Sequence, residues 1–92
     1  MEWYRFIVIG KVQGVFYRKS VSQAMMQKQF KGYIQNLSDG TVEVVAEVFD
    51  EDFDTFMHIL KEGSPLSNVE DIRYEIIETA EFTTDGFEIR YQ

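Results

Sequence analysis

The sequence contains no cysteine, one histidine and one proline among its 92 residues. Without cysteine the chain has no disulfide, no thiolate metal site and no cysteine nucleophile, which is typical of proteins in a reducing compartment. The histidine, His58, lies off the apolar stripe of its predicted helix, so we expect it to face solvent. Ser20 and Ser22 have no histidine partner for a serine triad. The common cysteine and serine hydrolase mechanisms are therefore excluded.

The chain also lacks a long hydrophobic run. Its first apolar segment follows Glu2 and Arg5 and is too short for a signal peptide or a membrane span. The sequence therefore predicts a soluble, cytoplasmic protein with no membrane partner.

Basic residues are scarce, with 9 Lys and Arg against 16 Asp and Glu and a net charge of −7. Such a charge opposes non-specific binding to nucleic acid, so we expect no nucleic-acid partner. The distribution is uneven, because residues 1–31 hold six basic residues and one acidic residue. This basic part contains a glycine-rich loop, which favours a local anion site.

The periodicity of apolar residues predicts five strands and two helices. The strands are expected at residues 3–9, 33–37, 41–48, 69–77 and 87–91, and the helices at residues 18–30 and 50–61. Gly32 is expected to end the first helix, and the third strand to have one buried and one mostly wet face. Residues 78–86 are predicted to form a polar, turn-like connection.

This order predicts one domain over residues 1–92 with an α+β, ferredoxin-like βαββαβ fold. We expect a two-layer sandwich, with an antiparallel sheet, two helices on one face and a short extra C-terminal strand. Right-handed crossovers place the first and third strands side by side in the sheet. A sandwich of this size can be a monomer, which is the expected state.

The loop between the first strand and the first helix is the strongest local signal for function. Residues 10–18 contain Gly10 and Gly14, end in Arg18 and include no acidic residue. A turn that opens a helix directs backbone N–H groups and the positive end of the helix dipole at one point. Arg18 adds a planar fork that suits phosphate or carboxylate. The sequence therefore predicts an anion-binding loop.

Two polar residues and one acidic cluster have alternative interpretations. Arg18 is either an anion ligand or part of a surface ion pair, and Asn36 is either functional or the start of an Asx turn. The acidic cluster at residues 50–54 is explained by the start of a helix, where the dipole favours acid, so no metal site is predicted.

Residues 10–18 (GKVQGVFYR) closely resemble the first signature of the acylphosphatases, and residues 32–42 (GYIQNLSDGTV) resemble the second. The similarity continues through residues 43–47 and, more loosely, to residues 63–65 and 87–91. Three residues depart from the family pattern, which usually has Phe or Met at Tyr17, a smaller residue at Ile34 and glycine at Val48. The first two are expected to affect packing beside the site.

The resemblance implies hydrolysis of a small acyl phosphate to a carboxylate and inorganic phosphate, without a cofactor or a metal. It implies that Asn36 positions the attacking water. It also implies that the phosphate is bound by the Arg18 side chain and by loop amides, those of Gln13, Gly14, Val15, Phe16, Tyr17 and Arg18. Phosphoryl transfer depends mainly on positioning and electrostatic stabilisation, which these groups supply.

Three other functions remain as alternatives. A catalytically idle relative would bind phosphate or acyl phosphate without hydrolysis. RNA-binding domains share the βαββαβ order, but the net charge of −7 and the absence of their aromatic signature oppose that function. Carbamoyl-phosphate handling would resemble the acylphosphatase-like domain of hydrogenase maturation proteins, which belongs to a larger chain.

Overall fold

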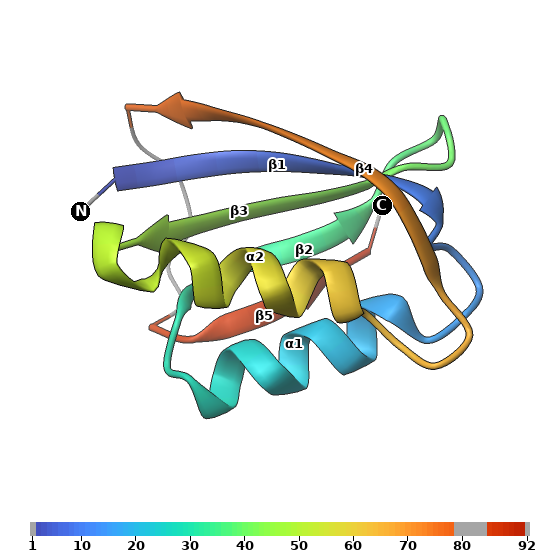
Figure 1. Ribbon diagram of the computed structural model, residues 1–92, viewed down its shortest axis with the longest axis horizontal. Coiled ribbons are helices and arrows are strands. Elements are labelled where there is room, and N and C mark those ends of the chain that lie inside the picture. Colours follow the sequence, from blue (N-terminus) through green and yellow to red (C-terminus); the bar gives the residue numbers. More distant parts are fainter. Residues whose placement is uncertain (1, 79–84, 92) are drawn as a thin grey trace.

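The fold is a two-layer α+β sandwich, which the computed structural model describes for residues 2–78 and 85–91. Its elements are, in chain order, β1 (Glu2–Lys11), α1 (Tyr17–Gln27), β2 (Lys31–Asn36), β3 (Val42–Val48), the short 3₁₀ helix η1 (Asp50–Asp52), α2 (Phe53–Glu62), β4 (Asn68–Ile77) and β5 (Phe87–Arg90). Both α-helices cover the same face of the sheet (Figure 1). The predicted ferredoxin-like order is confirmed. Most of the predicted connection at residues 78–86 lies outside the described residues.

The sheet has the strand order β4-β1-β3-β2-β5. As predicted, β1 and β3 are neighbours, and the first four strands pair in antiparallel fashion. The extra strand β5 lies at the edge and pairs parallel to β2, from Gly32 opposite Phe87 to Gln35 opposite Arg90. The complete sheet is therefore mixed, and the chain after β5 runs toward the end of β2.

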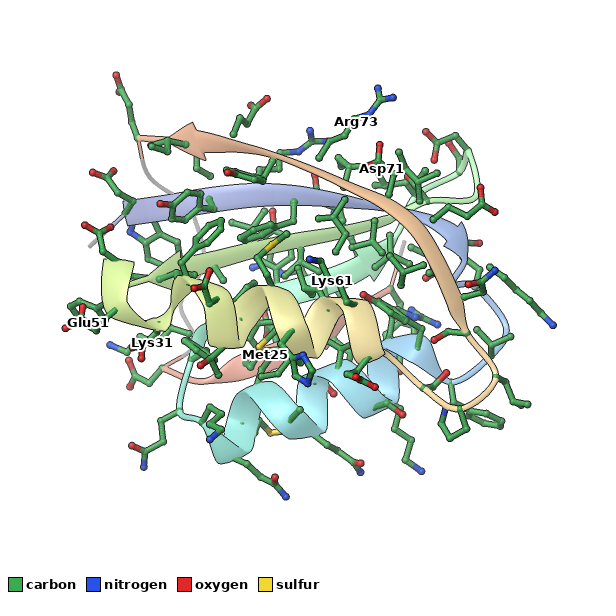
Figure 2. All side chains as sticks on the ribbon, in the orientation of Figure 1. Met25, Lys31, Glu51, Lys61, Asp71 and Arg73 are labelled. Atoms are coloured by element: carbon green, nitrogen blue, oxygen red, sulfur yellow. The ribbon has the colours of Figure 1, made fainter. Side chains whose placement is uncertain are left out.

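The core fills the space between the helices and the sheet. Alternate side chains of β1 and β3, including Phe6 and Val44, point to this face and are fully buried. Met25 of α1 lies in the same layer and is also fully buried, whereas Glu51 lies at the periphery (Figure 2). Each large apolar side chain buried in this way stabilises the fold by about 1.5–3 kcal/mol.

The other face of β3 was expected to be mostly wet, and this expectation is wrong. Glu43 is only 7% exposed, and Val45 is buried as well. Glu43 lies between two neighbouring strands, where Arg5 Nε donates to its Oε2 and Gln35 Nε2 donates to its Oε1, both at 2.6 Å. The long side chains of the flanking strands cover the middle of the sheet, so an alternating pattern did not indicate exposure here.

Helix α1 ends at Gln27, before the predicted end at Phe30, and Gly32 does not terminate it. Gln29 instead adopts the left-handed conformation that follows the helix, with φ of 61°. Gly32 belongs to β2, where a Cβ atom would lie 2.1 Å from the carbonyl oxygen of Val45. The glycine is therefore needed for the close approach of β2 and β3 and not for a helix cap.

Candidate active site

Three loops gather at one end of the sheet (Figure 1). They are the cradle loop (residues 12–16) after β1, the hairpin loop (residues 37–41) after β2 and the α2–β4 loop (residues 63–67). They meet there because β1, β2 and α2 all reach this end with their C-terminal residues. Segments far apart in the sequence thereby come to surround the start of α1.

The cradle loop presents unpaired backbone N–H groups at the start of α1. Phe16 is the N-cap residue, with φ of 61°, no side chain caps the helix, and its first turn contains no acidic residue. The N–H groups of residues 14–18 donate no hydrogen bond to any residue in the described ranges. An uncapped helix start carries partial positive charge, so this loop is suited to bind an anion.

A cavity of about 260 Å³ opens beside the cradle loop. Its lining combines four residues of the predicted phosphate site with four others: Val12, Gly14, Phe16, Tyr17, Arg18, Lys19, Ile89 and Tyr91. Two of these side chains are cationic and none is acidic, although the whole chain has a net charge of −7. The cavity therefore has a local charge opposite to that of the protein, which favours an anionic ligand.

Arg18 lies in the first turn of α1 and faces an aromatic ring from the other end of the chain. Its guanidinium carbon is 4.9 Å from the centroid of the exposed Tyr91 ring. A cation over an aromatic face gains about 0.5–1 kcal/mol at an exposed site. The contact helps to hold the guanidinium in the cavity. Sequence analysis did not include Tyr91 in the site, because the parallel pairing of β5 with β2 could not be inferred.

Asn36 ends β2 on the face that the helices cover, since it alternates with Gln35 and shares its side with Ile34. Its Oδ1 is buried and has no hydrogen-bond partner among the described residues. The parallel register sets Arg90 opposite Gln35, so Tyr91 follows at the level of Asn36. An unsatisfied buried acceptor is costly, so Oδ1 is suited to accept a hydrogen bond from a ligand or a water, and its neighbour in register, Tyr91, lines the cavity.

Gln13 connects the cradle loop to the hairpin loop through its side chain. Its Nε2 donates to the carbonyl oxygens of Leu37 and Thr41, each at 2.8 Å. Gln13, Val15 and Asn36 are not among the residues that line the cavity. The Gln13 side chain thus fixes the residue after Asn36 against the loop that carries the free N–H groups. Sequence analysis predicted only a backbone role for Gln13.

Tyr17 contributes its ring to the cavity, but its hydroxyl group is directed elsewhere. The Tyr17 hydroxyl donates to the carbonyl oxygen of Leu60, near the end of α2, at 2.7 Å. The side chain is buried, and this burial raises the pKa of Tyr17 far above its ordinary value. The hydroxyl therefore stays protonated at neutral pH and links α1 to α2.

The hairpin loop contains the tight turn predicted for residues 38–40. Asp39 Oδ1 accepts hydrogen bonds from Thr41 Oγ1 at 2.6 Å and from Thr41 N at 3.0 Å. These bonds favour the ionised carboxylate, and they hold the pKa of Asp39 below its usual value. The same threonine supplies one of the two carbonyl groups that bind Gln13. The turn therefore supports the contact between the two loops.

The described residues contain neither a cluster of metal-binding side chains nor a membrane-spanning helix. Residues 2–78 and 85–91 contain no group of three or more His, Cys, Asp or Glu side chains placed to hold a metal ion. No helix in this part of the chain is long and apolar enough to cross a membrane.

Comparison with known proteins identifies one family. The acylphosphatase family model matches residues 4–89. An acylphosphatase from Bacillus licheniformis is 41% identical over 88 residues, which are 96% of this chain and 93% of that protein. The crystal structure of an acylphosphatase from Bacillus subtilis superposes with a TM-score of 0.87 at 36% identity, covering 99% of this chain and 100% of that one. The structure of HypF from T. kodakarensis also matches, with a TM-score of 0.83 at 30% identity, but only 12% of that chain is covered.

Proposed function

From the premise that the chain belongs to the acylphosphatase family and hydrolyses acyl phosphates, we propose roles for two parts of the site. Arg18 and the cradle loop bind the phosphate, and Asn36 positions the attacking water. The phosphate ligands are the Arg18 guanidinium and the N–H groups of residues 13–18. The observation that carries this assignment is the set of unpaired N–H groups at residues 14–18, which opens beside Arg18 in an acid-free cavity.

The phosphoryl group is expected to lie at the start of α1, with its equatorial oxygens facing the N–H groups and Arg18. These donors are fixed before the substrate binds, so they stabilise developing negative charge without reorganisation. Lys19, at the cavity wall, adds a second positive charge. In this arrangement the protein supplies positioning and electrostatics, which are the main needs of phosphoryl transfer.

Asn36 is proposed to act through its buried Oδ1, which accepts a hydrogen bond from the water. The water oxygen forms a bond to phosphorus while the bond between phosphorus and the acyl oxygen breaks. The electron pair of that bond leaves with the carboxylate, and the water proton passes to a phosphate oxygen. The products are a carboxylate and inorganic phosphate. A carboxylate leaves without protonation, so this reaction needs neither a protein general acid nor a metal ion.

Three further assignments complete the proposal. All described strands belong to one sheet with one core, which supports a single domain over residues 1–92. We propose that this domain acts as a monomer, because a sandwich of this size can bury its core alone. A cytoplasmic location is proposed because the sequence contains no cysteine.

The test compares hydrolysis of acetyl phosphate and binding of inorganic phosphate, both with a chelator present. Arg18→Ala is expected to weaken phosphate binding by roughly a hundredfold, as for the loss of a charge-assisted hydrogen-bonding pair. Asn36→Ala is expected to lower kcat by roughly a hundredfold and to keep phosphate affinity. A non-catalytic phosphate-binding protein would instead bind phosphate without any hydrolysis.

The chain offers a matched control for each variant. Arg73→Ala removes an arginine whose side chain is 76% exposed, and Asn68→Ala removes an exposed asparagine at the start of β4. Both controls should leave hydrolysis and phosphate binding unchanged. Full turnover in Asn36→Ala would remove Asn36 from the mechanism, and unchanged phosphate affinity in Arg18→Ala would remove the proposed phosphate site.

A further inference from the structure

Ser64, in the α2–β4 loop, contacts the cradle loop from outside the cavity. Its hydroxyl donates to the carbonyl oxygen of Val15 at 2.6 Å, although the two residues are 49 positions apart. Ser64 is only 6% exposed, and it is not among the residues that line the cavity. This hydroxyl therefore acts on the backbone of the cradle loop and does not meet the cavity itself.

Ser64 is itself held firmly in place. Its backbone N–H donates to Ser67 Oγ at 2.9 Å, and that hydroxyl donates back to the Ser64 carbonyl at 2.9 Å. The preceding residue, Gly63, packs so closely on Tyr17 that a Cβ atom would lie 2.6 Å from the ring. The α2–β4 loop thus has little freedom to move relative to the start of α1.

The bond to Val15 fixes the direction of a cradle N–H group. The peptide group between Val15 and Phe16 is planar and trans, so its carbonyl and its N–H point in opposite directions. With the carbonyl held by Ser64, the Phe16 N–H is directed to the opposite side. Phe16 also has φ of 61°, a conformation that costs a non-glycine residue free energy and persists only when its surroundings impose it.

We propose that Ser64 is a positioning residue for phosphate binding, an inference that rests on the proposed function of the cradle loop. By holding the Val15 carbonyl, the Ser64 hydroxyl keeps the Phe16 N–H directed at the bound phosphate. Loss of this hydroxyl lets the peptide group rotate, and the phosphate then loses one donor.

The test is phosphate affinity in Ser64→Ala, measured by titration of the folded protein with inorganic phosphate. The expected result is a roughly tenfold rise in Kd, the effect of one lost hydrogen bond to a charged group. The KM for acetyl phosphate should rise in step, with a smaller change in kcat. Ser64→Thr keeps a hydroxyl group and should restore most of the affinity.

Ser22→Ala is the matched control. Ser22 is also buried, at 2% exposure, and its hydroxyl donates to the Lys19 carbonyl within α1 at 3.1 Å. Ser22→Ala removes a buried serine hydroxyl, as Ser64→Ala does, and should leave the Kd for phosphate within about twofold of wild type. An equal loss of affinity in Ser64→Ala and Ser22→Ala would overturn the proposal. So would an unchanged Kd in Ser64→Ala.

An NMR measurement separates orientation from general loosening. Phosphate should shift the Phe16 amide proton downfield in the wild-type protein, and this shift should shrink in Ser64→Ala. No downfield shift in the wild-type protein would overturn the proposal. If Ser64→Ala does not fold, Ser64→Cys takes its place, because cysteine has a similar shape and only a weak donor. It should likewise raise the Kd for phosphate and reduce the phosphate-induced shift of the Phe16 amide proton.

The outcomes also separate this proposal from the proposed function. If Arg18→Ala loses phosphate affinity and Ser64→Ala keeps it, only the role of Ser64 is wrong. If phosphate affinity survives in Arg18→Ala, the phosphate site itself is wrong.

Discussion

Replacing Tyr17 with phenylalanine should destabilise the protein at neutral pH, because a buried carbonyl group would lose its donor. Leu60 is fully buried near the end of α2. The two N–H groups that could have bonded its carbonyl within the helix have other acceptors. The Gly63 N–H donates to the Ile59 carbonyl oxygen, and the Ser64 N–H donates to Ser67 Oγ. The Tyr17 hydroxyl is therefore its donor within the described part of the chain.

The expected cost is about 1–3 kcal/mol, the penalty for a buried carbonyl left without a partner. For a domain of this size each kcal/mol lowers Tm by about 4–8 °C. Urea unfolding of wild type and Tyr17→Phe at pH 7, followed by the fluorescence of Trp3, the only tryptophan, would measure the difference.

Alkaline pH should reduce this difference. Burial raises the pKa of Tyr17 in the folded protein above 10, its ordinary value and the value expected for the unfolded chain. The hydroxyl then contributes stability that is complete below pH 10 and is lost as the pH rises toward the folded pKa. At pH 11 the wild-type protein should have lost about 1.4 kcal/mol through this residue, and Tyr17→Phe should not have.

Tyr74→Phe is the control, since it removes a hydroxyl from a side chain that is 53% exposed. It should change the free energy of unfolding at pH 7 by no more than about 0.5 kcal/mol. Equal stability of Tyr17→Phe and wild type at pH 7 would show that the Leu60 carbonyl does not depend on Tyr17. A penalty of the same size at pH 7 and pH 11 would refute the claim that the native state holds Tyr17 protonated.

Three further changes have defined outcomes. Gln13→Ala removes both bonds to the hairpin loop and should lower kcat for acetyl phosphate by roughly tenfold, an effect that Lys11→Ala, at an exposed neighbouring position, should not reproduce. Gly63→Ala should destabilise the protein by about 1–3 kcal/mol in thermal unfolding, because the new Cβ would meet the Tyr17 ring at a residue with φ of 56°. Asp39→Asn should be less stable than wild type at neutral pH. Because the pKa of Asp39 is lowered in the folded protein, the carboxylate stabilises the fold above the unfolded pKa, and this contribution disappears as the pH falls through the folded pKa. The free energies of unfolding of the two proteins, measured across an acid titration, should therefore become equal at low pH.

The elements of this fold could be predicted from the sequence because their signals are local. Strand and helix periodicities gave the βαββαβ order, and the Asp39-Gly40 pair marked the hairpin turn. Crossover handedness then placed β1 beside β3, which the structure confirms. The two motifs also led to Arg18 and Asn36, whose roles remain predictions.

Contacts between distant segments could not be predicted in this way. The stacking of Tyr91 on Arg18 depends on the parallel pairing of β5 with β2, which no local pattern specifies. The partner of the Tyr17 hydroxyl depends on where α2 ends. The sequence predicts a helix cap at Gly32, because glycine suits both a helix end and a close approach between strands, and only the distance to β3 distinguishes the two roles.

The ion pair on the open face of the sheet has a consequence for errors in strand pairing. Arg5, Glu43 and Gln35 come from three adjacent strands, and their bonds form only when β1, β3 and β2 are correctly aligned. A slip of β2 by one residue would deprive Glu43 of a partner, and it would also turn Asn36 to the face away from the cradle loop. A misaligned β2 thus leaves one carboxylate oxygen of the buried Glu43 without its donor, at a cost of about 1–3 kcal/mol, although the ion pair with Arg5 remains. Polar contacts on the far side of the sheet therefore select against molecules in which the two halves of the site do not face each other.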